Sequence, residues 1–278
     1  MNAIAQPTAL TGSNVVRGKL TFPHVIRSEW TKLTTLRSTR WTMLVAVVLT
    51  IGLPSIFAAI TANRWSHMSI QDKLDRQPLD IALAGVRIPA PLAIGILAVL
   101  VITGEYSTGM IRASLTAVPK RLPVLWAKLL VFAVTAFALM LPSTLIAFFA
   151  TQAILDRHHI LQISFSSGGV ARSVIGGAVY LMMLGILALS LGAIARNTAA
   201  GIGIFAAIFF VIPPLLLILP SNWHDAISGY MPDAAGVSIF SLTHGAHELA
   251  PWPGFFLFLG YCTVAVVTAA ILLVRRDA

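Results

Sequence analysis

Residues 173–219 read SVIGGAVYLMMLGILALSLGAIARNTAAGIGIFAAIFFVIPPLLLIL, two long apolar runs divided only by Arg196 and Asn197. Each run holds about 20 residues or more, and a helix of that length matches a hydrocarbon core of roughly 30 Å. An apolar run of this length without charges predicts a membrane-spanning helix. The two-residue connection predicts a tight hairpin between two such helices.

Four further runs of the same kind lie at residues 41–60, 79–103, 124–150 and 255–274. Hydrophobic residues make up 57% of the 278 residues and charged residues 10%, whereas an ordinary soluble domain carries about 25% charged residues. This composition excludes a soluble fold. The sequence predicts an all-α integral membrane protein, with a flexible tail over residues 1–21 and one six-span domain over residues 22–278.

The formal charge is +9, and the distribution of the basic residues between the two sides of the membrane predicts the orientation of the chain. If the N-terminus is cytoplasmic, 13 of the 19 Lys and Arg residues lie inside, and six lie outside: Arg64, Lys73, Arg76, Arg87, Arg157 and Arg172. Because cytoplasmic loops carry the excess of Lys and Arg, both termini are expected in the cytoplasm. No nucleic-acid partner is needed to explain the charge.

The segment before the first run, residues 23–40, predicts a helix that lies in the cytoplasmic interface. Ile26, Trp30 and Leu33 recur at helical spacing. Glu29 projects near the centre of this stripe and is expected to pair with Lys32 one turn on.

The loop over residues 104–122, GEYSTGMIRASLTAVPKRL, predicts a short cytoplasmic helix. Ser107 or Thr108 can cap its start, Pro119 stops it, and its apolar side chains share one face. These side chains are Met110, Ile111, Leu115 and Val118. An apolar face on such a loop is covered either by the lipid interface or by another protein.

On the outer side, residues 220–254 are expected to form short helices against the mouth of the bundle, with Trp223, Tyr230 and Trp252 at the headgroup level. His244 and His247 stand close together there, but their order differs from H-E-x-x-H and no third ligand is indicated. A solvated loop is the favoured interpretation, and no metal site is predicted.

Two absences narrow the possible functions. The chain has no G-x-x-x-x-G-K-[ST] phosphate loop, so it is not expected to hydrolyse ATP itself by that route. No Asp, Glu or His lies at the centre of an apolar run, where an ion-coupled carrier would be expected to place one. Arg87 lies near the outer end of the second run, where it either reaches the outer headgroups or faces water on an exit path.

These features together resemble the permease subunit of bacterial type-2 ATP-binding-cassette transporters. The resemblance rests on the basic interfacial helix, six spans with both ends inside, the long outer segment before the last span, and the loop with Glu105, Gly109 and Pro119. It covers residues 22–276. In that family the loop forms a coupling helix that docks on the ATPase, although many members have Thr-Leu where this chain has Met110 and Ile111.

The resemblance implies an exporter of amphiphilic cargo (drug, antibiotic, lipid or peptide-like) in the bacterial cell membrane, without catalytic residues. Its partners would be two soluble ATPase subunits, which use ATP and Mg, and a second permease, identical or homologous. Coupling would fall to Glu105, Gly109, Met110, Ile111, Leu115, Pro119, Lys120 and Arg121, beside the interfacial residues Glu29, Trp30 and Lys32. Glu105 is expected to pair with Arg40 or Arg121.

The path or gate would be lined by Arg87, Phe205, Phe209, Ile212, Leu215 and Leu216. Pro213 and Pro214 must kink or end the fifth helix because they donate no backbone hydrogen bond. The same side chains could instead face lipid or pack the bundle. An ion-coupled carrier or channel and a membrane scaffold remain as alternative functions.

Overall fold

The computed structural model describes residues 21–110, 122–160 and 162–275, and every regular element within them is helical. Six stretches are long and apolar enough to cross a membrane. They are α2 (Arg37–Arg64), α6 (Pro89–Ser107), α8 (Leu122–Arg157), α9 (Val170–Ala195), the pair α10 (Thr198–Ala206) with α11 (Ile212–Leu216), and α14 (Pro251–Arg275). The predicted all-helical, six-span class is confirmed at this level.

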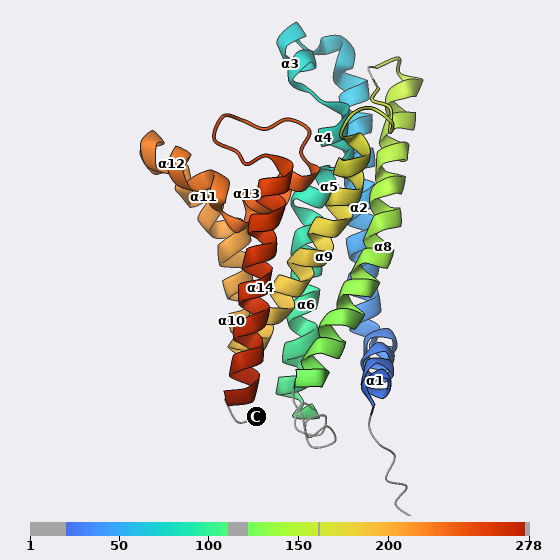
Figure 1. Cartoon of the computed structure of the whole chain (residues 1–278). Coiled ribbons are helices and arrows are strands. Elements are labelled where there is room, and N and C mark those ends of the chain that lie inside the picture. The colour runs from blue at the N-terminus through green and yellow to red at the C-terminus, as the bar shows by residue number, and fades with distance from the viewer. Residues whose placement is uncertain (1–20, 111–121, 161, 276–278) are drawn as a thin grey trace, which may run out of the picture.

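Short elements lie at both ends of the bundle (Figure 1). At one end, α1 (Phe22–Thr35) lies beside the start of α2, and the end of α14 lies at the same level. At the opposite end are α3 (Ile70–Asp75), α12 (Ser221–Ile227) and α13 (Pro232–Val237). We refer to these as the α1 end and the α12 end. The remaining short elements are η1 (Trp65–His67), α4 (Pro78–Ala82), α5 (Ala84–Arg87), η2 (Ala207–Val211), η3 (Ser228–Tyr230) and η4 (Ser238–Phe240).

The core of the bundle is built around α9, which packs against α6, α8, α10 and α14. Of its apolar stretch 72% is buried within the chain, compared with 17% for the stretch from α10 to α11. Small residues permit close approach: a Cβ at Gly95 would lie 2.0 Å from the ring of Phe205, which is fully buried. The helices are therefore held by close packing of small and aromatic residues.

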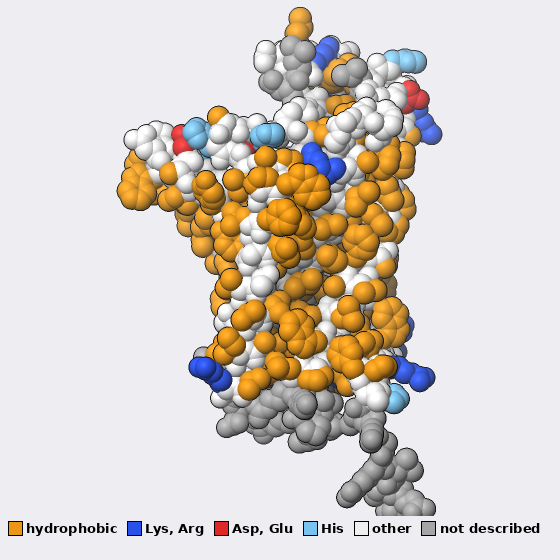
Figure 2. Space-filling view, viewed as in Figure 1, with side chains coloured by type: hydrophobic (Ala, Val, Ile, Leu, Met, Phe, Trp, Pro, Cys, Tyr) orange, Lys and Arg blue, Asp and Glu red, His pale blue; other side chains and the backbone are white. Residues whose placement is uncertain are grey.

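The outside of the bundle is apolar along most of its length. In Figure 2 hydrophobic side chains cover the middle of the visible face, whereas Lys, Arg, Asp, Glu and His side chains appear near its two ends. Among the exposed apolar side chains on α2 are Trp41, Leu44, Val48 and Ile56. An apolar band between polar ends is the surface that a lipid bilayer solvates.

The second span differs from the prediction. Residues 79–103 were expected to form one helix, but the chain forms α4 and α5 before α6 begins at Pro89. Ile88 lies outside the helical region, with φ −128° and ψ −61°. Proline disfavours helical backbone at the residue before it, and Pro89 provides no N–H to continue a preceding helix. The spanning part is therefore α6 alone.

The fifth span agrees with the prediction that the prolines interrupt it. The helix widens to a π-helix at η2 directly before Pro213 and Pro214, and it ends at Leu216 rather than at the predicted Leu219. In Figure 1, α11 and α12 lean away from α14. The tight connection between α9 and α10 is confirmed: Arg196 is left-handed (φ 54°), and Asn197 Oδ1 accepts from Ala200 N. The segment before α14 also forms the expected short helices, α12, η3, α13 and η4.

The helix predicted over residues 23–40 is shorter than expected. It ends at Thr35, because Leu36 is extended (ψ 117°) and α2 begins at Arg37. Val25, Glu29 and Leu33 form its buried side. Trp30, which was predicted in the apolar stripe, is 47% exposed on the surface of the chain.

Candidate functional site

Four charged side chains from three helices meet at the α1 end. Lys128, six residues into α8, donates to Glu29 Oε2 of α1 (2.5 Å) and to Glu105 Oε1 of α6 (2.8 Å). Lys32 of α1 donates to Glu29 Oε1 (2.6 Å) and to Glu105 Oε1 (3.1 Å). We call these residues the four-charge cluster. It has two positive and two negative charges, and it joins helices that are far apart in sequence.

The cluster is largely buried. Lys128 is 3% exposed, Glu29 4% and Glu105 7%. Removing a charge from water costs several kcal/mol unless a partner and hydrogen bonds compensate for it. Each carboxylate here contacts both ammonium groups. The cluster therefore depends on all three helices being docked together.

Two members lie outside the spanning segments, and their pKa values show the balance of burial and charge. Burial by itself would raise the pKa of Glu29, but the ammonium groups of Lys128 and Lys32 lower it below the ordinary 4.5. Burial would likewise lower the pKa of Lys32, but hydrogen bonds and attraction from Glu29 and Glu105 raise it above 10.5. Both groups are charged at neutral pH.

The local sequence explains part of this geometry. Glu29 and Lys32 lie three residues apart on α1, so they share a face, and this predicted pair is confirmed. Val25 and Leu33 fix that face against the bundle, where Val25 clusters with Val124 and Ala127 of α8.

The predicted pairing of Glu105 with Arg40 is corrected by the structure. Glu105 contacts Lys32 and Lys128, whereas the guanidinium of Arg40 donates to the carbonyl of Thr34 near the end of α1. The other predicted partner, Arg121, lies outside the described residues. Lys128 was not predicted as a site residue. The sequence did contain a signal for it. Lys128 lies within the first two turns of one apolar run, and Glu105 lies at the end of the preceding run.

The loop after α6 is described only as far as Met110. Gly109 is left-handed (φ 70°) and Met110 is 43% exposed. Ser107 and Thr108, predicted to cap the following helix, both donate to Gly104 O and so close the end of α6. Ile111, Leu115, Pro119, Lys120 and Arg121, on which most of the predicted coupling face depends, lie outside the described residues.

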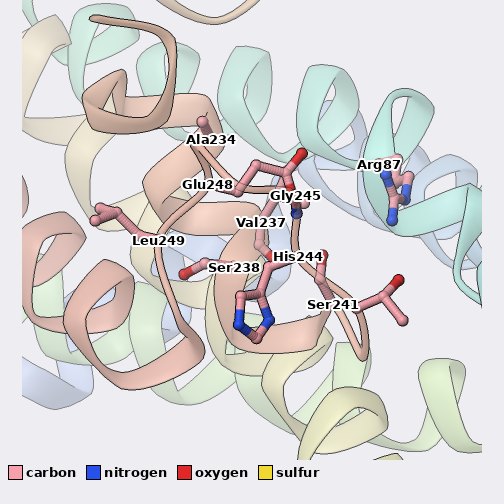
Figure 3. Close-up of a pocket in the computed structure, with 10 residues that line it drawn as sticks. Arg87, Ala234, Val237, Ser238, Ser241, His244, Gly245, Glu248 and Leu249 are labelled. Atoms are coloured by element: carbon pink, nitrogen blue, oxygen red, sulfur yellow. Dashed lines mark hydrogen bonds between the residues drawn. The ribbon is translucent and has the colours of Figure 1, made fainter. Parts of the chain in front are cut away.

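At the α12 end a cavity of about 400 Å³ lies between Arg87 and the segment from α13 to Leu249 (Figure 3). Arg87 Nη2 lies 3.0 Å from Asp80 Oδ1, and its guanidinium lies 5.9 Å from the ring centre of Phe240. Both charged side chains are more than 40% exposed. The Arg87 guanidinium is therefore open to the surroundings at the α12 end, as both predicted positions for it require.

The loop that borders this cavity is held by its own hydrogen bonds. Glu248 Oε2 accepts from the backbone N–H of Gly245, and His244 also lines the cavity (Figure 3). His247 Nε2 lies 3.7 Å from Asp225 Oδ2. Over residues 21–110, 122–160 and 162–275, no group of three or more His, Cys, Asp and Glu side chains could hold a metal ion.

The predicted path residues divide into two sets. Phe205 and Phe209 are buried in the core of the single chain, where they stack on one another with ring centres 5.2 Å apart, so they do not reach its surface. Ile212 and Leu215 are exposed, and Leu216 is half-buried. The aromatic pair packs the bundle because Gly95 of α6 leaves room for the Phe205 ring.

Comparison with known proteins adds no assignment. Neither a scan against protein-family models nor a search of curated proteins finds a match to this chain. Function is therefore inferred from the residues and geometry of the chain itself.

Proposed function

We propose that the chain is the membrane-spanning permease subunit of an ATP-driven exporter, which forms the path for an amphiphilic cargo and is driven by a separate ATPase. The observation that carries the proposal is the four-charge cluster. It ties α1 to the ends of α6 and α8, the two helices joined by residues 108–121.

This arrangement suits the transmission of movement. A partner that binds the loop between α6 and α8 displaces the ends of both helices, and these ends carry Glu105 and Lys128. Glu29 contacts Lys128 directly, so α1 moves with them. Met110, exposed at the start of the loop, provides an apolar contact for the partner.

Two observations favour this function over an ion-coupled carrier. Among the described residues, no Asp, Glu, Lys, Arg or His lies in the central part of a spanning helix. The buried charges are gathered at one end and neutralise one another, whereas proton and ion carriers place such groups along the transport pathway.

The assembly proposed is two permeases, identical or homologous, with two ATPases that bind ATP and Mg, in a bacterial cell membrane. The excess of basic residues on the side of α1 and α14 supports cytoplasmic termini. In this assembly, the exposed apolar surface of α11, which includes Ile212 and Leu215, contacts the second permease and closes the path.

Co-purification of an ATPase encoded beside this chain tests the proposal. Met110→Asp combined with Leu115→Asp is expected to release the ATPase while the permease stays folded in the membrane, because charge is placed on the docking face. Ile70→Asp combined with Leu219→Asp, at exposed positions of the α12 end, is the matched control. Undiminished ATPase recovery with the Met110 and Leu115 pair would refute the docking assignment.

Orientation is tested separately with an impermeant thiol reagent in intact cells. Cysteine introduced at Asp225 is expected to react, and cysteine introduced at Ser114 is expected to remain unlabelled. The reverse pattern would overturn cytoplasmic placement of the α1 end.

A further inference from the structure

We propose that a groove beside Arg76, at the α12 end, binds an anionic phospholipid. Its phosphate lies on the Arg76 guanidinium and one acyl chain lies along α2. The site is at the opposite end of the bundle from the four-charge cluster. It therefore goes beyond the proposed function and does not depend on it.

The groove lies between the last two turns of α2 and the segment from Arg76 to the start of α5. Phe57 and Ile60 line it on the side of α2, and Ile81 of α4 lines the opposite side. Its volume is about 430 Å³, within the range of about 300–1,000 Å³ found for small-molecule sites. The groove is thus large enough to hold part of a lipid.

The Arg76 side chain is exposed and has donors to offer. Its Nη1 donates to Thr61 Oγ1 (3.2 Å), and the hydroxyl of Thr61 is on a residue only 1% exposed, so the guanidinium is held at the wall of the groove. It forms no ion pair with any carboxylate that the structure describes. A guanidinium carries five N–H donors in a planar fork that matches the oxygens of a phosphate. Arg76 is therefore placed to bind a phosphate group.

The surrounding charges favour an anion. Asp80 lines the same groove, but its carboxylate pairs with Arg87. An adjoining cavity of about 210 Å³, which Arg76 also lines, is lined by Lys73.

Over residues 64–87 the sequence holds four basic and three acidic side chains, a net charge of +1. They are Arg64, Lys73, Arg76 and Arg87, with Asp72, Asp75 and Asp80. A head group with a net negative charge is therefore favoured over a neutral one.

The apolar wall of the groove argues for a lipid rather than a free phosphate ion. Phe57 is 42% exposed and Ile60 43% exposed, so this wall is open to the membrane side of the chain. Phe57 lies seven residues before Arg64, which corresponds to about 10 Å along a helix. Trp65, directly after α2, is of the residue type that marks the head-group level. The groove thus runs from the head-group level into the apolar band, as a phosphate with its acyl chain does.

The test uses the purified full chain in phosphatidylcholine nanodiscs, without ATPase. Two probes carry a photoreactive diazirine in one acyl chain: phosphatidylglycerol, and diacylglycerol, which lacks the phosphate. Cross-links on Phe57, Ile60 and Ile81 are counted relative to those on Phe256 and Leu259, which are exposed on the first half of α14. This ratio corrects for the amount of each probe in the bilayer.

We expect phosphatidylglycerol to label the groove about tenfold more than diacylglycerol, the ratio that a hydrogen bond between charged groups gives. Arg76→Gln is expected to abolish this preference. Arg76→Lys is expected to keep part of it, because lysine retains the charge without the planar fork. Arg157→Gln is the matched control, since Arg157 is exposed at the same end and lines neither cavity.

Equal labelling by the two probes in the wild type, or an equal loss in Arg76→Gln and Arg157→Gln, would overturn the site. The wild-type comparison needs no variant, so it decides the question even if Arg76→Gln fails to fold. Because no ATPase is present, these outcomes are independent of ATPase release by the Met110 and Leu115 variant.

Two further measurements distinguish the lipid from other occupants. Excess inorganic phosphate, added at constant ionic strength, is expected to leave the labelling unchanged, because an ion leaves the apolar wall uncovered. Loss of labelling would assign Arg76 to free phosphate and overturn the lipid. A disulfide between two copies of Ile60→Cys, together with no labelling of the wild type, would assign the groove to a second copy of the chain and would also overturn it.

Discussion

The two ends of the bundle both carry ion pairs, but they bury them to different degrees. At the α1 end, Lys128, Glu29 and Glu105 are almost fully enclosed and join three helices. At the α12 end, Arg87 and Asp80 remain more than 40% exposed and join only α4 and α5. Exposed pairs contribute about 0–1 kcal/mol, whereas breaking a buried pair costs about 3–5 kcal/mol. The difference predicts which end fixes the arrangement of helices.

The largest effect is expected for Lys128→Met, which leaves the two carboxylates with Lys32 alone. The free energy of unfolding in mixed micelles should fall by about 3–5 kcal/mol. Arg27→Met, on the exposed side of α1, is the control. Adding Glu29→Gln to Lys128→Met should lose less than the sum of the two single changes, because it removes the negative charge that Lys128 no longer balances. A loss no larger than that of Arg27→Met would contradict the comparison.

A smaller effect at the same cluster is expected from acid. Because the folded pKa of Glu29 lies below 4.5, its contribution is complete above that pH and is lost as the pH falls through the lower folded value. Stability should therefore decline below about pH 4.5 more steeply in the wild type than in Glu29→Gln. Unfolding measured from pH 3 to pH 7 tests this, and parallel curves would refute it.

The next effect in size is expected at the α12 end for Arg172→Gln. The Arg172 guanidinium donates to the carbonyls of Ile239 (2.6 Å) and Ser241 (3.0 Å), which ties α9 to the end of η4. Its loss should cost about 1–3 kcal/mol and increase proteolysis of the following loop. The exposed Arg157→Gln is the control, and an equal cost for both would show that these bonds contribute nothing specific.

The smallest effect is expected for Arg87→Gln, about 0–1 kcal/mol, since its pair with Asp80 is open to solvent. The difference in stability between the wild type and Arg87→Gln should become smaller still in high salt. A loss as large as that of Lys128→Met would show that the exposed pair also fixes the bundle, and would remove the contrast between the two ends.

The sequence was sufficient for the number of spans and for the contact between Glu29 and Lys32. Both depend on short-range rules, namely the length of an apolar run and the spacing on one helix. It was not sufficient for the second span, because the effect of Pro89 on Ile88 competed with an uninterrupted apolar run.

The sequence by itself determined that this chain forms six apolar helices, since a backbone in lipid must satisfy its hydrogen bonds within helices. It also determined where charges are absent. Only the tertiary structure decided that Lys128 meets Glu29, a residue 99 positions away, and Glu105. Such a meeting depends on how α1, α6 and α8 pack, and the packing is set by many small contacts that leave no periodic signal.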